Sequence, residues 1–400
     1  MKHVQPLRAS IDLASLDAIA ERSASIVQQV RASMLAPEAR KRPPRFNSSQ
    51  LADLCRVEKS KIPYLSKKGN LPAGLKDGQR LEWTLVEARQ WVKSLRADFL
   101  RDTKLGAAAV ITVANFKGGV SKTTTAAALA QGLSLRGHKV LVIDTDPQGS
   151  LTTLFGVLPD TEVDEDQTIL PLCAGTADSI MSAVQPTYWD GIDLVAAAPL
   201  LFNAEFLLPS RQKVEKDFEF WKVLENGLSE AVDVYDVIII DTPPALSYIT
   251  INALMAAQGV LMPLPPNALD FASSQQFWNL TTEVLGGLLK SRGTNKKFNF
   301  IDVVLSRVDR SDVVSAAVKQ WITAAYGGMV LPVEIPKTSI AASASAEFGT
   351  VYDVDQSSVQ AKTLKRARDA YDQLVDYVES QILGVWANDA ELLGHQGVSK

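Results

Sequence analysis

Hydrophobic residues follow two different patterns along the chain, and the change falls near residue 110. Beyond that point, short apolar runs alternate with segments of helical spacing; the runs are VITVA, VLVID, VIIID, GVLMPLP and FIDVVLS. Runs without polar alternation are typical of strands buried on both faces, as in a parallel sheet. The pattern therefore predicts an α/β fold over residues 110–385, with a parallel sheet flanked by helices.

Residues 1–37 carry one apolar stripe. Leu16, Ile19, Ile26, Val30 and Met34 recur at helical spacing, and Pro37 ends the predicted helix. The spacing approximates a short heptad pattern, as in helices that pair with another helix. Two arrangements are open from the sequence: packing against the rest of the chain, and a dimer seam with a second copy.

Residues 38–101 predict a small module of short helices and one hairpin. Asp77-Gly78 is a two-residue hairpin signal, and Thr84 begins a capping box with Glu87. The predicted elements are two short helices, a hairpin and a third helix, at 48–55, 59–66, 75–81 and from Thr84 onward. This is the order of a winged helix-turn-helix, and it resembles the MerR-type variant. A linker at 102–109 follows, and residues 386–400 read as a C-terminal tail.

Charge is distributed unevenly, although the net charge is only −4. Residues 38–101 have 15 Lys and Arg against 7 Asp and Glu, whereas residues 102–400 have 22 against 35. A basic module before an acidic domain indicates nucleic-acid contact confined to the module; a small helical adaptor with a solvated basic face is the alternative. The residues expected to contact DNA are Ser48, Ser49, Lys59, Lys61, Lys67, Lys68, Lys76 and Arg80.

Composition excludes several classes of protein. Apolar residues are 46% and charged residues 22% of the chain, as in a globular protein. Cys55 and Cys173 are the only cysteines and are far apart, which argues against a zinc site, an iron–sulfur cluster or a disulfide framework. The chain shows neither an apolar run long enough to span a bilayer nor a signal-peptide core, so we expect a cytoplasmic protein.

The segment that begins at Val110 reads as a strand, a glycine-bearing loop and an Ala-rich helix. Gly118 and Gly119 allow the backbone amides to face inward, and the helix start adds a positive dipole end, so the loop suits phosphate groups. Lys122 can reach the β- and γ-phosphates of a nucleotide, and Thr123 can offer its hydroxyl to Mg²⁺. These residues predict a nucleotide-binding site.

Acidic residues follow two of the later apolar runs. Asp144 and Asp146 come directly after VLVI, and Asp241 comes after VIII. Because ligands bind beyond the carboxyl ends of parallel strands, these carboxylates are expected to converge on the phosphate loop. Asp241 would then hold Mg²⁺ through water, and Asp146 would orient the attacking water.

The motifs KGGVSKTT, DTDPQGS and DTPP together resemble those of the ParA/MinD ATPases, which have a deviant P-loop; the resemblance covers about 110–383. One departure is Ser121, which replaces the usual glycine before Lys122 and leads us to expect slow hydrolysis. The resemblance implies ATP or ADP and Mg²⁺ as cofactors, with Lys117 reaching the phosphates of a dimer partner. The catalytic residues it implies are Lys117, Lys122 and Asp146, and the metal-binding residues are Thr123, Asp144 and Asp241. The ATP-binding residues it implies are Lys117, Gly118, Gly119, Val120, Ser121, Lys122, Thr123, Thr124, Pro265, Pro266 and Arg307.

The winged-helix extension and the segment PLPPNALDFASS resemble the larger ParA proteins of partition systems. The resemblance implies a nucleoid-associated homodimer that works with a ParB-type centromere-binding protein and represses its own operon. It also implies sequence-independent DNA binding, for which the expected residues are Lys337, Lys365, Arg366 and Arg368. A solvated face is the alternative for this cluster. Other readings are a MinD-like membrane-bound regulator, a metabolic P-loop enzyme and a nucleotide-sensing repressor; the acidic C-terminal tail argues against membrane binding.

Overall fold

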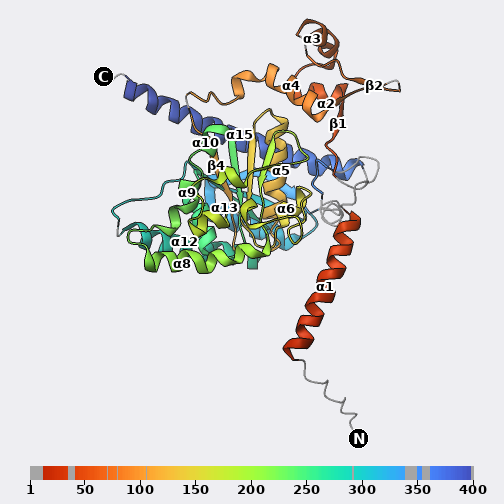
Figure 1. Cartoon of the computed structure of the whole chain (residues 1–400). Helices are drawn as coiled ribbons and strands as arrows, with labels where there is room; N and C mark the ends of the chain where they lie inside the picture. The colour runs from red at the N-terminus through yellow and green to blue at the C-terminus, as the bar shows by residue number, and fades with distance from the viewer. Residues whose placement is uncertain are drawn as a thin grey trace. The chain divides into compact units, whose positions relative to one another are not determined.

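The structure is a computed structural model in which the chain divides into two units, Met1–Lys41 and Arg42–Lys400 (Figure 1). Each unit is considered by itself. The residues described are 12–34, 41–69, 71–78, 80–104, 106–290, 292–337, 349–353 and 361–397.

The described part of the first unit is one helix, α1 (Leu13–Met34). It begins where the Asp12 carboxylate accepts a hydrogen bond of 2.8 Å from the backbone N–H of Ser15. The expected apolar stripe is exposed, since Leu16, Ile19, Ile26 and Val30 keep 43% to 61% of their surface. A single helix has no second surface of its own, so burial of this stripe requires a further surface.

The second unit begins with a three-stranded antiparallel sheet and its helices, in the order β1-β3-β2. We call residues 42–101 the basic module. Its elements are β1 (Arg45–Asn47), α2 (Ser48–Cys55), η1 (Lys59–Lys61), α3 (Ile62–Lys68), β2 (Leu75–Asp77), β3 (Arg80–Thr84), α4 (Leu85–Leu95) and η2 (Ala97–Phe99).

Local sequence signals explain most of these elements. Asn47 and Thr84 each form a capping box, at the starts of α2 and α4. The second helix differs from the expected 59–66: residues Lys59–Lys61 form a 3₁₀ turn and α3 begins at Ile62. Pro63 lies in the first turn of α3, where its missing N–H costs nothing, and this favours the later start.

Two tryptophans organise the core of the basic module. Trp83 and Trp91 are buried, and both indole N–H groups donate to the carbonyl oxygen of Pro72 at 2.9 Å. Phe46 and Leu51 are buried in the same hydrophobic cluster. This cluster continues into the larger domain, so the module packs against it rather than standing apart.

The larger domain contains an eight-stranded sheet in the order β11-β10-β9-β4-β8-β5-β7-β6. All neighbouring strands are parallel except β6 and β7, which confirms the predicted parallel sheet. The strands are β4 (Ala109–Val113), β5 (Val140–Asp144), β6 (Gln185–Pro186), β7 (Ile192–Val195), β8 (Val237–Asp241), β9 (Gly259–Leu264), β10 (Phe300–Val308) and β11 (Val330–Pro336).

Helices cover both faces of this sheet (Figure 1). Alternate residues of a strand enter different clusters: Ile111 packs with α5 and α15, whereas Val110 packs with α7 to α11. The helices are α5 (Lys122–Leu135), α6 (Ser150–Leu154), η3 (Glu165–Gln167), α7 (Leu170–Ala174), η4 (Ile180–Ala183), η5 (Pro199–Asn203), α8 (Ala204–Val214), η6 (Phe220–Lys222), α9 (Val223–Gly227), α10 (Ala231–Val234), α11 (Tyr248–Ala256), α12 (Ala268–Lys290), α13 (Val313–Tyr326), η7 (Gly327–Met329) and α15 (Ala361–Gly397).

The C-terminal boundary differs from the expectation. A separate tail was expected from residue 386, but α15 continues through that position to Gly397. Trp386 is only 8% exposed, and its indole N–H donates to the carbonyl oxygen of Ala107 at 3.1 Å. The buried positions Val378, Ile382 and Val385 recur at helical spacing up to Trp386, so the helix stays attached to the domain beyond residue 385.

Candidate nucleotide-binding site

The loop between β4 and α5 turns sharply before the helix begins at Lys122. Gly119 and Ser121 both have positive φ angles, of 75° and 76°. The left-handed region of positive φ costs a residue with a β-carbon about 1 kcal/mol, whereas glycine adopts it without this cost. Ser121 thus adopts a left-handed backbone conformation that glycine adopts without strain, and the loop carries this strain.

The end of β10 supports this loop from the side. The Ser306 hydroxyl donates to the carbonyl oxygen of Val120 at 2.9 Å, and the Arg307 guanidinium donates to that of Gly119 at 2.5 Å. Arg307 was expected to bind ATP, and here its guanidinium contacts the phosphate loop. Pro265 and Pro266, which were also expected to bind ATP, are buried just beyond β9.

The two lysines of the loop have different environments. Lys122 is 6% exposed, and its ammonium donates to the carbonyl oxygen of Lys117 at 3.0 Å. Burial lowers the pKa of Lys122, while the carboxylates of Asp241 and Asp146 act in the opposite direction. Lys117 is more exposed, and its ammonium lies 2.5 Å from a carboxylate oxygen of Asp270 on α12.

Strand register brings the acidic residues to the same edge of the sheet. Asp241 pairs with Val113 on one side and with Asp144 on the other. Among the described residues, neither buried carboxylate oxygen of Asp241 has a well-formed hydrogen bond. Burial and then Asp144 raise the pKa of Asp241 well above its usual value, against the lowering effect of Thr123 and Lys122. A buried, unsatisfied carboxylate beside a threonine hydroxyl fits a Mg²⁺ ion.

Asp144, which was expected to bind metal, accepts hydrogen bonds through both carboxylate oxygens. One carboxylate oxygen accepts hydrogen bonds from the backbone N–H and the hydroxyl of Thr152, at 2.9 and 2.8 Å. The other accepts the backbone N–H of Asp146 at 3.1 Å. Burial raises the pKa of Asp144 to about 7, although these hydrogen bonds lower it. In this structure Asp144 therefore fixes the loop after β5.

Asp146 lies in that loop, half-buried. Its carboxylate accepts the backbone N–H of Gln148 at 3.0 Å, which leaves the second carboxylate oxygen without a described partner in the loop. Thr123 lies in the first turn of α5, also half-buried. The structure therefore brings Lys122, Thr123, Asp146 and Asp241 together at one edge of the sheet.

The residues expected to contact DNA from the basic module lie on its surface. Ser48 is half-buried in the first turn of α2, and the others are exposed. Lys59 and Lys61 lie on the 3₁₀ turn rather than on the second helix. The remaining expected positions are Ser49 on α2, Lys67 and Lys68 at the end of α3, Lys76 on β2 and Arg80 on β3.

The basic residues expected near the C-terminus do not form a uniform patch. The ammonium of Lys365 pairs with Asp369 at 2.7 Å, and Arg368 lies over the ring of the buried Tyr352 at 5.3 Å. Arg366 is exposed, as is Lys337, which follows β11. A cleft of about 880 Å³ lies here, and its charged lining consists of Arg310, Glu334, Lys362, Lys365, Arg366 and Asp369.

Two residues of the site were given no role from the sequence. Asn115 donates through its side-chain amide to the carbonyl oxygen of Pro263 at 2.9 Å and accepts the backbone N–H of Lys117 at 3.1 Å. Asp270 is held by Asn267, whose side chain accepts the backbone N–H of Asp270 at 3.0 Å. The sequence signal for Asp270 is its N-x-x-D spacing, which falls at the start of α12.

A central strand, a glycine-bearing turn, a helix that begins at a buried lysine and a neighbouring unsatisfied aspartate define a P-loop nucleoside triphosphatase. An AAA domain family matches residues 108–297. The chain belongs to the ParA/MinD family of P-loop ATPases, as its relatives establish.

Three relatives illustrate this membership. A replication protein A of Sinorhizobium fredii is 33% identical over 349 residues, which are 84% of this chain and 85% of the relative. SopA of Escherichia coli is 30% identical over 81% of this chain and 84% of the relative. The chromosome partitioning protein ParA of Caulobacter vibrioides is 32% identical over 65% of this chain and 92% of the relative.

Solved structures agree with the fold. A partition protein superposes with a TM-score of 0.65 over 94% of this chain and 99% of its own, at 18% identity. Cobyrinic acid a,c-diamide synthase from Mycobacterium smegmatis, solved with ADP and magnesium, has a TM-score of 0.51 and 28% identity over 67% and 93% of the two chains. The nucleotide and metal of that structure are those expected for this chain. No helix in the described ranges is long and apolar enough to cross a membrane.

Proposed function

We propose that the chain is a partition ATPase that hydrolyses ATP to ADP and phosphate and dimerises when ATP is bound. The observation that carries the proposal is the buried, unsatisfied Asp241 carboxylate beside Lys122 and Thr123. Burial of a carboxylate without hydrogen bonds is unfavourable, and a divalent cation with its phosphate ligand would compensate for it. The partition role is supported by the relative from Caulobacter vibrioides, which is named as a chromosome partitioning protein.

In this mechanism the loop amides and Lys122 bind the phosphates, and Thr123 and Asp241 hold Mg²⁺. Mg²⁺, when bound, neutralises charge on the β- and γ-phosphates. Asp146 orients the water that attacks the γ-phosphate. We expect slow hydrolysis by the chain alone, with a ParB-type partner and DNA increasing the rate.

The Lys117–Asp270 ion pair gives a first prediction about dimerisation. In the single chain Asp270 holds the ammonium that is proposed to reach the partner's phosphates. Asp270→Asn removes the competing charge and should strengthen ATP-dependent dimerisation about fivefold, corresponding to about 1 kcal/mol for a partly exposed pair. Lys117→Ala should weaken the same dimerisation. Analytical ultracentrifugation with a non-hydrolysable ATP analogue measures both.

Glu283→Gln is the matched control, because it neutralises an exposed carboxylate on the same helix α12, away from Lys117. It should leave the dimer dissociation constant unchanged. Equal effects of Asp270→Asn and Glu283→Gln would mean that general charge, rather than the ion pair, controls assembly.

We propose two separate DNA-binding surfaces. The basic module would act as a winged helix that reads an operator, with α3 in the major groove and the β2–β3 hairpin on the backbone. Sequence-independent binding would use the exposed charges beside the C-terminal cleft, including Lys362 and Arg366. The first surface supports repression of its own operon, and the second supports attachment to the nucleoid in the ATP state.

This division predicts a double dissociation between two variants. Lys59→Ala with Lys61→Ala should remove the operator footprint but keep ATP-dependent binding to unrelated DNA. Lys362→Ala with Arg366→Ala should do the reverse and should lower the salt slope of unrelated-DNA binding by about 0.9 for each phosphate that the variant no longer neutralises. Footprinting and fluorescence anisotropy at several salt concentrations measure the two activities.

Lys213→Ala with Lys216→Ala is the control, since both side chains are exposed near the end of α8 and their removal changes net charge equally. It should affect neither activity by more than about twofold. If each of the two test variants abolished both activities together, one surface would serve both kinds of DNA.

A further inference from the structure

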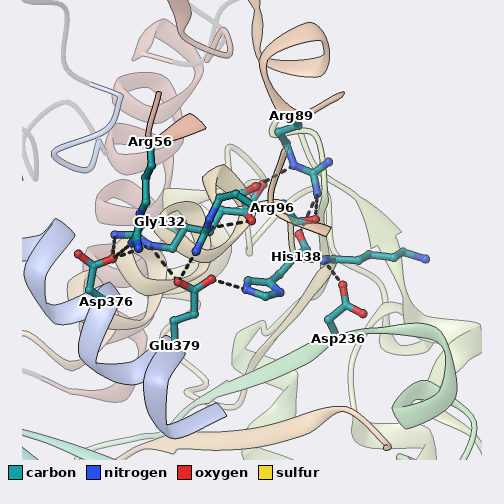
Figure 2. A network of polar contacts seen from close by, with 12 residues as sticks. Arg56, Arg89, Arg96, Gly132, His138, Asp236, Asp376 and Glu379 are labelled. Atoms are coloured by element: carbon teal, nitrogen blue, oxygen red, sulfur yellow. Dashed lines mark hydrogen bonds and ion pairs between the residues drawn. The ribbon is translucent and has the colours of Figure 1, made fainter. Parts of the chain in front are cut away.

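An arginine from the basic module closes the carbonyl end of the P-loop helix. Arg89 of α4 is 5% exposed, and its guanidinium donates to the carbonyl oxygens of Ser134 at 2.9 Å and His138 at 2.8 Å (Figure 2). It also forms an ion pair with Asp190. Because the last carbonyls of a helix carry its negative dipole end, a cation is favoured at this position.

A second arginine of the module and one from the domain complete this end. Arg96 donates to the carbonyl oxygen of Arg136 at 3.1 Å, and Arg136 donates to that of Gly132 at 3.0 Å. Arg96 also pairs with the buried Glu379 of α15 at 2.8 Å. Two of the three guanidinium groups at the end of α5 therefore come from the basic module.

The Glu379 carboxylate also connects α15 to this end of α5. We call the contacts of Arg89, Arg96, Arg136 and Glu379 at this end the joint. Glu379 lies 2.7 Å from the imidazole of His138 (Figure 2). Burial raises the pKa of Glu379, but His138 and Arg96 outweigh it and lower the pKa to about 2. The carboxylate is thus ionised, and it balances the positive charge that Arg96 brings into a buried place.

The place of Arg89 is shaped by a glycine. A β-carbon on Gly191 would lie 2.1 Å from the central carbon of the Arg89 guanidinium. Gly191 has a φ of 81°, which also favours glycine. The turn before β7 therefore leaves room for this one side chain, and the joint is a built feature rather than a surface contact.

Helix α5 links this joint to the proposed phosphate site. It has 14 residues, about 21 Å of helix, with Lys122 at one end and the arginines at the other. Its residues from Thr125 to Leu135 are all buried, so the helix is held as a packed rod whose ends move together.

We propose that α5 transmits the nucleotide state of the P-loop to the basic module. A shift of α5 on nucleotide binding would move Arg89 and Arg96, which contact its C-terminal end, and with them α4. This rests on the proposed binding of ATP at Lys122. By linkage, whatever the module binds then alters nucleotide affinity by the same factor. The arrangement makes Arg89 a positioning residue, because it touches the end of α5 and none of the groups at the phosphate site.

Arg89→Ala in the full chain tests the coupling. Calorimetry with a non-hydrolysable ATP analogue and Mg²⁺ gives nucleotide affinity, and hydrogen exchange with and without that analogue gives the response of residues 48–95. Arg89→Lys is the second variant, since it keeps the charge and packing but cannot bridge two carbonyls as a guanidinium does. Gln90→Ala is the control: Gln90 follows Arg89 on α4, and its side chain is exposed and has no described contact with the end of α5.

In the wild type, the analogue should change amide exchange in α4 and the rest of the module. Arg89→Ala should reduce that change at least fivefold while nucleotide affinity stays within about threefold, and Arg89→Lys should lie between them. If Arg89→Ala fails to fold, Arg89→Lys decides. Gln90→Ala should behave as the wild type.

Three results would overturn the coupling. They are an undiminished response in Arg89→Ala or, if that variant does not fold, in Arg89→Lys; an equal reduction in Gln90→Ala; and a wild-type module that does not respond although calorimetry shows that the nucleotide binds. The last of these would leave the proposed ATPase function standing. Absence of nucleotide binding in the wild type would instead overturn that function together with the coupling.

Discussion

Replacement of Lys122 with alanine is expected to lower affinity for Mg²⁺-ATP by about 100-fold or more, since the triphosphate would lose its main fixed cation. Lys122 is buried, and its ammonium donates to the backbone of the phosphate loop itself. Burial lowers its pKa, but a bound triphosphate would favour the charged form again. Isothermal titration calorimetry measures the change in affinity.

Lys117→Ala is the matched control, because it removes the other lysine of the same loop. Its ammonium points to Asp270 rather than toward the loop backbone. Nucleotide affinity should therefore stay within about threefold of the wild type, with the defect appearing in dimerisation. A Lys122→Ala protein that is folded by circular dichroism and binds Mg²⁺-ATP normally would refute the assignment of the site.

The phosphate loop could be predicted because its information is local. Gly118, Gly119 and Lys122 are neighbours in the chain, and their chemistry follows from a strand that runs into a helix. Asp241 could be predicted from the general rule that parallel strands end at one edge, and register confirms its place beside β4. The left-handed backbone conformation of Ser121 could not be predicted from the sequence, because its φ angle is determined only by the folded loop.

Contacts between distant segments were the ones missed. Arg307 was assigned to ATP binding from resemblance, and the contact of its guanidinium with Gly119, 188 positions away in the chain, was not predicted. The pairing of Lys117 with Asp270 likewise depends on how α12 packs. Arg89 binds backbone carbonyls, which leave no residue-type signal at all at the accepting positions.

Helix boundaries show the same difference between local sequence signals and contacts with distant segments. The starts of α2 and α4 depend on capping residues within three positions, so sequence signals found the start of α4 at Thr84. The continuation of α15 past residue 385 goes with a distant contact, since the indole of Trp386 donates to the backbone of Ala107. Residues 386–400 contain acidic residues and few apolar ones, so the sequence predicted a tail, although Trp386 at its start is buried.

Substitutions of two aspartates at the site are expected to cause different defects, one in hydrolysis and one in Mg²⁺-dependent binding. Asp146→Ala should keep Mg²⁺-ATP affinity within about threefold but lower hydrolysis about 100-fold, because the attacking water is no longer oriented. Asp241→Asn should weaken Mg²⁺-dependent binding about tenfold or more, because the amide cannot replace a carboxylate toward the cation. Calorimetry with and without Mg²⁺, and phosphate release under partner and DNA stimulation, separate the two defects.

The pH dependence of binding gives the sharper test of Asp241. Its pKa is raised, chiefly by burial and then by Asp144, so lowering the pH protonates the carboxyl in the free protein. The protonated form cannot hold a cation, and Mg²⁺-ATP affinity should fall as the pH falls, with binding accompanied by proton release. Asp241→Asn has no such proton to lose, so its weaker affinity should depend less steeply on pH than that of the wild type, through the nucleotide itself and through Asp144, whose pKa is raised to about 7. Asp146→Ala, which removes a neighbouring charge, should keep the wild-type direction. Affinity that falls equally with pH in the wild type and Asp241→Asn would place the metal on another group, and an equal decrease of affinity in both aspartate variants would remove the division of roles.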